Sequence, residues 1–331
     1  MSRAVLLLAH GTPNVLGEMA EYLGKVTGGR PMPEAVVEEL KHRYALIGLG
    51  ETPGGEPPPL TKWTVAQGRA LEQMLDGTPV YIAMRNWSPY IADVVEQMRA
   101  DGVTTIRAIC MAPQNSRTSV GLYRRALMAA ANGMQVEFVA EWADSSLLVR
   151  AFAEKLQPVW TRASTELGTN APVLFTAHSV PCRTIMTGEA SVAGARPGTP
   201  MQDTPDPYPV EAKRTAALVA EQLKPAGLTG QDWYFAFQSQ GVSGGPWIGP
   251  TVEETLKALR QEGHTGVVIQ PVGFVCDHVE VLYDIDIAFK ELADQLGLKL
   301  WRAESLNDSP TLTKALVEVA ASNQPAAIKA D

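Results

Sequence analysis

Two nine-residue segments of the chain match at five positions in the same register, and they constrain the fold more than any other feature. Residues 5–13 read VLLLAHGTP and residues 173–181 read VLFTAHSVP, with Val, Leu, Ala, His and Pro in matching positions. Each begins as a continuously apolar strand, which is typical of a parallel sheet covered on both faces. The repeat predicts two similar lobes, with His10 and His178 at the carboxyl ends of equivalent strands.

The rest of the chain alternates between strand and helix patterns in both halves. Further strands are expected at 80–84, 105–111 and 136–139 in the first half, and at 233–237, 267–273 and 299–302 in the second. Apolar residues at helical spacing predict helices between them, including 65–75 and 145–156. The sequence therefore predicts an α/β fold of two doubly wound, Rossmann-like lobes with parallel four-stranded sheets and an inter-lobe cleft. The expected domains are residues 1–168 and 169–321, followed by a flexible tail at 322–331.

Composition limits the partners and the location. The formal net charge is −8 and no polybasic run occurs, which argues against a nucleic-acid partner. The longest early apolar run, residues 4–9, is too short for a secretory or transmembrane segment, so we expect no transmembrane segment and a cytoplasmic location. Cys110, Cys182 and Cys276 lie far apart, which fits reduced thiols better than a disulfide, zinc or iron–sulfur framework.

Residues 271–286, PVGFVCDHVEVLYDID, read as a buried strand that turns directly into a helix. Asp277, Glu280 and Asp284 are spaced i, i+3 and i+7, which predicts that they share one helix face. Ligands of open α/β sheets bind at the carboxyl ends of strands, where clustered acids suit a cation. For Asp277 alone, a favourable place near a helix N-terminus is the simpler interpretation.

Three loops are candidates for contacts with a ligand. Residues 51–59 are rich in Pro and Gly and are interpreted as a lid, and the irregular stretch 187–209 is long enough to suggest a function. Residues 238–250 hold polar and aromatic side chains, among them Trp247, which suits either a packing role or a ligand contact. Thr251 and Glu254 then predict a capping box at the start of the next helix.

His178 and Glu280 together suggest metal or proton chemistry. Imidazole and carboxylate suit a divalent first-row metal, and either group removes protons near neutral pH. Two protein ligands leave coordination positions open, which suits a metal that is handed on.

At this point the longer motifs indicate a family. PVLFTAHSVP, FAFQSQG with PWIGP, DPYP, PVGFVCDHVEVLYDID, LLLAHGTP and RYALIGLG resemble segments of the ferrochelatases over nearly the whole chain. The resemblance implies a two-lobed chelatase that inserts ferrous iron into a porphyrin, either protoporphyrin IX or coproporphyrin III, in haem synthesis. It implies that His178 and Glu280 are the catalytic pair, as metal ligands and proton acceptors, with Asp284 as a further metal ligand. The candidate substrate contacts are His10, Arg30, Arg43, Tyr123 and Trp247.

The sequence also departs from these relatives. Many of them carry a further carboxylate where this chain has Ala288, and those that use coproporphyrin tend to carry Tyr where it has His10. The cysteines of cluster-bearing ferrochelatases are absent, so we expect no iron–sulfur cluster and no permanently bound cofactor. Expected partners are the porphyrin, ferrous iron and, transiently, other haem-pathway enzymes. The alternatives are a sirohydrochlorin-type cobalt or nickel chelatase and a non-catalytic carrier of tetrapyrrole or iron.

Overall fold

Two parallel sheets organise the computed structural model, which describes residues 2–185, 206–241, 246–322 and 328–329. The first has the order β2-β1-β3-β4 and the second has the order β6-β5-β7-β8, so the two sheets repeat one topology as the sequence match predicted. The strands of the first sheet are β1 (Ser2–Ala9), β2 (Val80–Met84), β3 (Val103–Cys110) and β4 (Gln135–Val139). Those of the second are β5 (Val173–His178), β6 (Trp233–Gln238), β7 (Gly266–Pro271) and β8 (Lys299–Arg302).

The first strand shows why its sequence is apolar throughout. Val5 and Leu7 pack into the core on one face of the sheet, whereas Leu6 and Leu8 pack into a second core on the other face. All four side chains are at most 2% exposed. Alternate residues of a strand point to opposite faces, so a strand covered on both sides favours apolar residues at consecutive positions.

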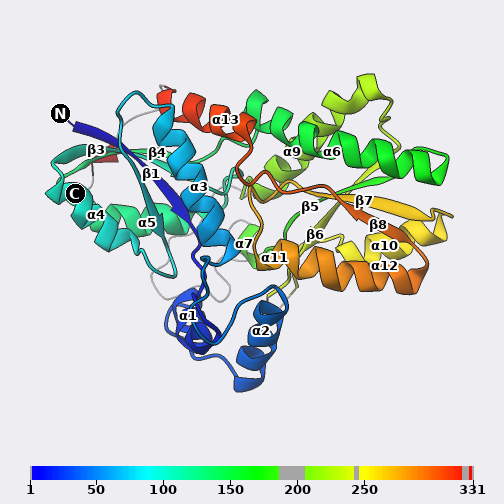
Figure 1. Ribbon diagram of the computed structural model, residues 1–331, viewed down its shortest axis with the longest axis horizontal. Coiled ribbons are helices and arrows are strands. Elements are labelled where there is room, and N and C mark those ends of the chain that lie inside the picture. The colour runs from blue at the N-terminus through cyan, green and yellow to red at the C-terminus, as the bar shows by residue number, and fades with distance from the viewer. Residues whose placement is uncertain (1, 186–205, 242–245, 323–327, 330–331) are drawn as a thin grey trace.

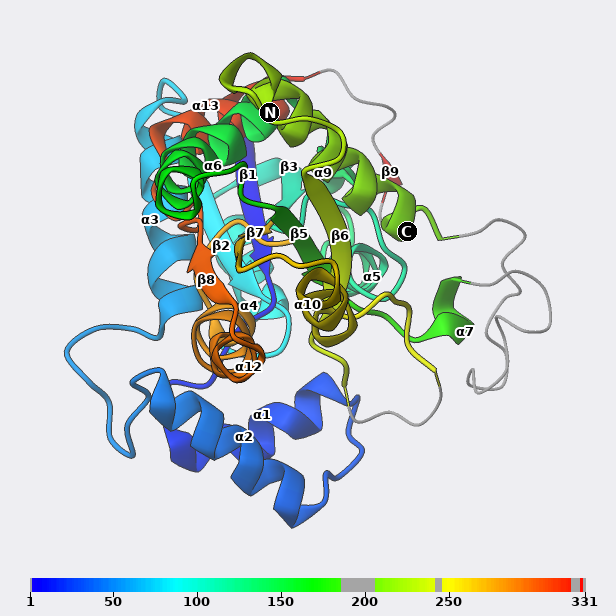
Figure 2. The ribbon, with the colours of Figure 1, turned by 90° about the vertical axis from the view of Figure 1, so that its right-hand side faces the viewer.

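Helices cover both faces of each sheet. Around the first sheet lie α3 (Pro59–Gln73), α4 (Ile91–Ala100) and α5 (Val120–Ala130). Around the second lie α9 (Tyr208–Leu223), α10 (Val252–Gln261) and α12 (Lys290–Leu296), with the short helices α7 (Cys182–Ile185) and α11 (Val279–Leu282) near its carboxyl end. Helices α1 (Met19–Val26) and α2 (Glu34–Leu46) pack together and stand below the junction of the two sheets (Figures 1 and 2).

Two helices are exchanged between the lobes. Helix α6 (Ser146–Leu167) follows the first sheet in the chain but packs on β7 and α9 of the second. Helix α13 (Pro310–Ala321) follows the second sheet but packs on α3 and β3 of the first, and Figure 1 shows it lying across both lobes. The buried Arg107 of β3 donates to the carbonyls of Val319 (2.7 Å) and Ser322 (2.8 Å). The expected boundary near Gly168 thus divides the sheets but not the helices that cover them.

Several expected elements have different bounds. The helix expected at 145–156 continues to Leu167, because Pro158 lies on its exposed side, where water can satisfy the carbonyl that a proline leaves unbonded. Helix α3 begins at Pro59 instead of residue 65, since proline is well suited to the first turn of a helix. Within the expected flexible tail, β9 (Ile328–Lys329) pairs antiparallel with β4 and adds a fifth strand to the first sheet. Most of the loop at 187–209 lies outside the described residues.

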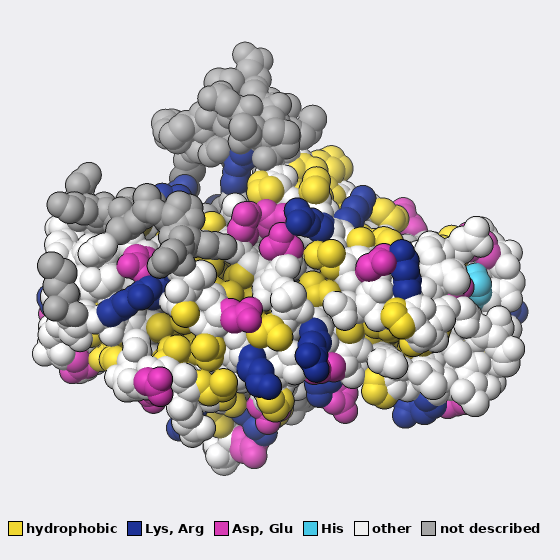
Figure 3. All heavy atoms as spheres, turned by 90° about the horizontal axis from the view of Figure 1, so that it is seen from above, with side chains coloured by type: hydrophobic (Ala, Val, Ile, Leu, Met, Phe, Trp, Pro, Cys, Tyr) yellow, Lys and Arg dark blue, Asp and Glu magenta, His cyan; other side chains and the backbone are white. Residues whose placement is uncertain are grey.

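The surface and the thiols agree with the composition. On the face seen in Figure 3, Lys and Arg side chains are scattered among Asp and Glu without forming a basic patch. Cys110, Cys182 and Cys276 are free thiols, as expected. Where the chain is described, no helix combines the length and apolar character needed to cross a membrane.

Candidate active site

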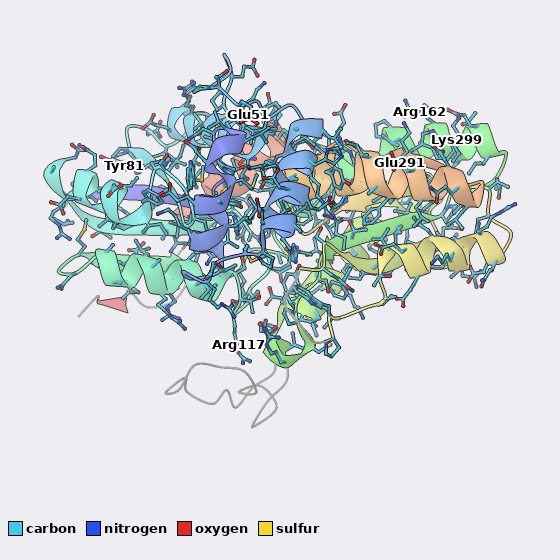
Figure 4. All side chains as sticks on the ribbon, turned by 90° about the horizontal axis from the view of Figure 1, so that it is seen from below. Glu51, Tyr81, Arg117, Arg162, Glu291 and Lys299 are labelled. Carbon is cyan, nitrogen blue, oxygen red and sulfur yellow. The ribbon has the colours of Figure 1, made fainter. Side chains whose placement is uncertain are left out.

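A cavity of about 660 Å³ lies where the carboxyl ends of the two sheets meet. This volume is typical of sites for small molecules and cofactors. Side chains from both lobes line it, among them His10, Tyr22, Tyr44, Arg85, Ser116, Tyr123, His178, Tyr208, Trp247, Phe274, His278 and Glu280. The loop interpreted as a lid also contributes, through Thr52, Gly54 and residues 56–59. Glu51 at the start of this loop and Arg117 in the loop before α5 lie on opposite sides of α1 and α2 (Figure 4).

His178 ends a strand and is held there by contacts from α9 and from the residue that follows the neighbouring strand β7. It ends β5, and the hydroxyl of Tyr208 donates to its carbonyl oxygen (2.8 Å). Gly273, just after β7, passes so close that a Cβ atom there would lie 2.9 Å from Cα and Cβ of Ala177. Only glycine fits at this position without displacing the end of the strand that carries His178.

His178 and Glu280 form a charged pair at the cavity. His178 Nε2 lies 3.1 Å from Glu280 Oε1, and its Nδ1 contacts the carbonyl of Ser179, so both ring nitrogens face acceptors. Burial disfavours the imidazolium, but the adjacent Glu280 carboxylate outweighs burial and raises the pKa of His178 to about 9. Burial likewise opposes ionisation of Glu280, but His178 and His278 hold the pKa of Glu280 well below its ordinary value. Near neutral pH the pair is therefore an imidazolium and a carboxylate.

The acidic helix differs from the one expected. Glu280 lies in α11, and after Tyr283 the chain forms a π-helical turn over Asp284–Phe289. Asp277 precedes the helix, so the expectation that Asp277, Glu280 and Asp284 share one helix face is wrong for Asp277. Burial, together with the charge of Glu280, raises the pKa of Asp284 to about 6, although a hydrogen bond from Ser239 opposes the shift. Single-turn π-helices often occur at functional sites.

The sequence patterns did not assign a role to three residues that contact this acidic segment. His278 Nε2 lies 3.3 Å from Glu280 Oε2, which gives Glu280 a histidine on each side. Gln238 donates from Nε2 to the carbonyl of Glu280 (2.6 Å), and Ser239 donates to Asp284 from a left-handed backbone conformation with φ of 62°. The polar string QSQG at the end of β6 was the available signal. The left-handed backbone of Ser239, a conformation that concentrates at functional sites, is visible only in the structure.

His10 lies in the same cavity but differs from His178 in its protonation state. Asn86 Nδ2 donates to its Nε2 (2.9 Å), and its Nδ1 lies 3.2 Å from both the Gly11 carbonyl and the Tyr22 hydroxyl. Burial, supported by the positive charge of Arg85, lowers the pKa of His10 to about 4. The equivalent strand-end histidines of the two lobes are thus one neutral and one cationic. The contacts of His10 match a residue that hydrogen-bonds the turn after β1.

The remaining predicted contacts divide into two groups. Tyr123 and Trp247 line the cavity, whereas Arg30 and Arg43 do not. Arg30 donates to the Thr27 carbonyl, and Arg43 pairs with Glu39 and lies 5.0 Å from the ring centroid of Tyr283. Among the described residues, Arg85 is the arginine in the cavity wall, a position the sequence patterns did not indicate.

A preformed metal cage is not part of this arrangement. Within the described residues, no group of three or more His, Cys, Asp and Glu side chains is placed to hold a metal ion. His178 and Glu280 face each other at the cavity, and Asp284 does not complete a three-ligand set with them. The pair has the chemistry expected for a metal that passes through the site.

Two doubly wound lobes with an imidazole–carboxylate pair between them match the fold of solved chelatase structures. The structure of the sirohydrochlorin chelatase of Bacillus subtilis subspecies spizizenii in complex with cobalt aligns with a TM-score of 0.53, covering 97% of this chain and 96% of that one. At 12% identity, this likeness concerns the fold.

Sequence comparison identifies the family. The Ferrochelatase family model matches residues 2–324. The chain is 57% identical to the ferrochelatase of Acidobacterium capsulatum over 96% of its own length and 94% of the relative. It is 36% identical to the ferrochelatase of Herpetosiphon aurantiacus and 32% identical to the coproporphyrin III ferrochelatase of Geobacillus thermodenitrificans, covering 96% and 95% of this chain and 97% and 94% of those relatives, respectively. The chain belongs to the ferrochelatase family, which confirms the family and the metal-chelatase class expected from its motifs.

Proposed function

We propose that the protein inserts ferrous iron into a porphyrin held in the inter-lobe cavity. The observation that carries this proposal is the His178–Glu280 pair, which faces a cavity sized for a small molecule, in a chain of the ferrochelatase family. The reaction replaces two pyrrole N–H protons by one Fe²⁺ ion. The site therefore needs a group that accepts protons and a path by which the ion loses its water.

The charges of the pair suggest an order of events. Glu280 is a carboxylate before substrate arrives, so it is ready to accept a pyrrole proton or to bind the ion. His178 is protonated near neutral pH, so it acts as a ligand only after its proton has left. Ferrous iron that approaches the pair repels the imidazolium and favours this loss. Glu280 is the first group to act in this order, and His178 is the second.

Asp284 gives the released protons a next acceptor. Its pKa of about 6 lies close to neutral pH, and it follows Glu280 by one helical turn. A carboxyl with such a pKa both accepts and releases protons under physiological conditions. We propose that Asp284 acts behind Glu280 as a proton carrier rather than as part of a fixed metal cage.

Time-resolved absorption spectra under anaerobic conditions test the function. The protein is mixed with Fe²⁺ and either protoporphyrin IX or coproporphyrin III, with His178→Ala as the matched control. Conversion of the free-base spectrum to the iron–porphyrin spectrum by the wild type, and not by the control, supports the proposal. Binding without conversion of either porphyrin indicates a carrier. Cobalt or nickel insertion into sirohydrochlorin without iron insertion into porphyrin indicates the alternative chelatase. Competition between the two porphyrins then identifies the preferred ring.

Two further proposals concern the cellular setting. We propose that the enzyme holds no permanent cofactor and no iron–sulfur cluster, because its three cysteines are free thiols distributed over different elements. Iron and sulfide analysis of anaerobically purified protein tests this point. The thiols also suit the reducing cytoplasm, where transient contacts with other enzymes of haem synthesis would transfer the porphyrin. Cell fractionation and crosslinking in cells test these two points.

A further inference from the structure

The cavity wall between β7 and α11 depends on contacts from outside its own segment. Residues 272–278 lie outside any helix or strand, yet Val275, Cys276 and His278 line the cavity. Backbone groups in such a segment need partners elsewhere to be held in one place. Within the segment, Asp277 receives many of these contacts without lining the cavity itself. We call Asp277 and the four residues linked to it or to its neighbours the Arg302 network, namely Gln67, Asp286, Arg302 and Asn307.

Asn307 holds the segment on the side of the second lobe. Its Oδ1 accepts from the backbone N–H of Asp277 (2.8 Å), and its Nδ2 donates to Asp277 Oδ2 (2.9 Å). Its own N–H donates to the carbonyl of Val275 (3.1 Å). Asn307 adopts a left-handed conformation with φ of 45°, which asparagine tolerates better than most residues. Asn307 therefore holds both the backbone and the side chain of Asp277.

The first lobe reaches the same segment through α3. Gln67 is 2% exposed and donates from Nε2 to the carbonyls of Val275 (3.2 Å) and Asn307 (2.8 Å). A buried amide with two such acceptors fixes the relative position of α3 and the cavity wall. The support of the segment thus comes from both lobes.

Arg302, the last residue of β8, connects this wall to the π-helical turn. Its Nε and Nη2 donate to the two carboxylate oxygens of Asp286, at 2.6 and 2.9 Å, and its Nη1 lies 3.4 Å from Asp277 Oδ1. The side chains of Arg302 and Asp277 are only 16% and 17% exposed. A bidentate guanidinium–carboxylate contact fixes direction as well as distance, which a lysine ammonium cannot do.

These contacts hold both ends of the segment that carries Glu280 and Asp284. Asp277 precedes α11 and Asp286 lies within the π-helical turn, so Arg302 bridges across the acidic residues in sequence. Gln238 and Ser239 contact the same segment from β6. We propose that Arg302 is a positioning residue that sets the distance of Glu280 from His178 by clamping Asp277 and Asp286 together. The expected effect of Arg302 on iron insertion rests on the proposed function, whereas its effect on the position of Glu280 does not.

Steady-state kinetics of iron insertion test the role of Arg302. Arg302→Met lowers kcat by about tenfold or more and leaves the KM for porphyrin within about twofold, because displacing a reacting group by about 1 Å has an effect of this order. Arg302→Lys keeps the positive charge and regains much of the thermal stability, but not kcat. The matched control is Lys155→Met, which removes an exposed pair with Glu304 at 2.9 Å and leaves kcat unchanged. A wild-type kcat in folded Arg302→Met, or in Arg302→Lys should the first variant not fold, overturns the proposal.

A double-mutant cycle and hydrogen exchange separate this role from simple stabilisation. If Arg302 acts through Glu280, the effects of Arg302→Met and Glu280→Gln on kcat are strongly non-additive, whereas additive effects overturn the proposal. Amide hydrogen exchange over residues 279–289 needs no catalysis. Faster exchange in Arg302→Met than in Lys155→Met supports the clamp even if the wild type inserts no iron, and equal exchange overturns it. Absence of iron insertion by the wild type counts against the proposed function alone.

Discussion

Glu280→Gln removes the charge that keeps His178 protonated. In the wild type the carboxylate raises the pKa of His178 to about 9, whereas burial acting alone lowers it below the ordinary value of 6.5. The variant is therefore expected to lower the pKa of His178 from about 9, because burial then opposes the imidazolium without the Glu280 charge. Histidine NMR titration measures this change, with His178→Ala used to assign the signal. A His178 signal that titrates at the same pH in both proteins would refute the reasoning about the pair.

The same pair makes metal binding depend on pH. A divalent ion that binds His178 displaces one proton below pH 9, so apparent affinity rises about tenfold for each pH unit between about 7 and 9. Titration with Co²⁺, followed by its visible absorption, measures the slope. Glu280→Gln flattens the slope, because its His178 loses the proton at lower pH than in the wild type. The matched control is Glu262→Gln, which removes the carboxylate 3.8 Å from the half-buried His264, away from the cavity, and leaves the slope unchanged.

Stability follows the same titration with a defined sign. The folded pKa of His178 is raised above its ordinary 6.5, so the stability contributed by the His178 titration is fully present just below pH 6.5, where Glu280 is still a carboxylate. This stabilisation is lost as the pH rises through about 9. Thermal unfolding of the wild type between these limits should therefore show a steeper fall in Tm than that of Glu280→Gln. Parallel curves for the two proteins would contradict the assignment.

Other substitutions test the remaining parts of the site. His178→Ala should lower iron insertion by about 10² to 10⁴-fold in a folded protein, and a rate within a few-fold of wild type would exclude a direct role. Asp284→Asn should lower single-turnover rates no more than Glu280→Gln does, and the reverse order would move Asp284 to the reacting centre. His10→Ala should leave the absorption and paramagnetic resonance spectra of the haem product complex unchanged, whereas a new spin state would identify His10 as an iron ligand. Gly273→Ala should lower the rate of iron insertion, because the added methyl overlaps the end of β5. It should also lower the free energy of unfolding, measured by denaturant titration, by about 1–3 kcal/mol.

The local sequence patterns were sufficient to predict the two sheets and the pairing of His178 with Glu280. Buried parallel strands are recognisable because both faces must be apolar, and the repeated Ala-His at two strand ends located His10 and His178. Glu280 followed from its place after the strand that neighbours His178. These inferences use residues that are close in sequence, together with the rule that the carboxyl ends of parallel strands lie at one edge of a sheet. They could therefore be made without knowing how any side chain is oriented.

The rest of the site depends on contacts that the sequence does not encode locally. Arg85 lines the cavity whereas Arg43 turns to Tyr283, and no pattern distinguishes the directions of two such arginines. The π-helical turn after Glu280 arises where the backbone hydrogen bond from Ala288 reaches back to Tyr283, a shift that periodicity does not reveal. Sequence spacing assumes a regular helix, so it placed Asp277 on a face that it does not join.

The exchange of α6 and α13 between the lobes has a consequence for how the chain folds. Each sheet is covered on one side by a helix encoded in the other half of the sequence, and the two halves share one continuous core that includes Leu7, Phe152, Phe175 and Leu316. Neither half can bury its own sheet alone, so a chain cut at Gly168 would expose apolar surface on both fragments. Despite its internal repeat, the molecule should therefore unfold with its two lobes together rather than one after the other.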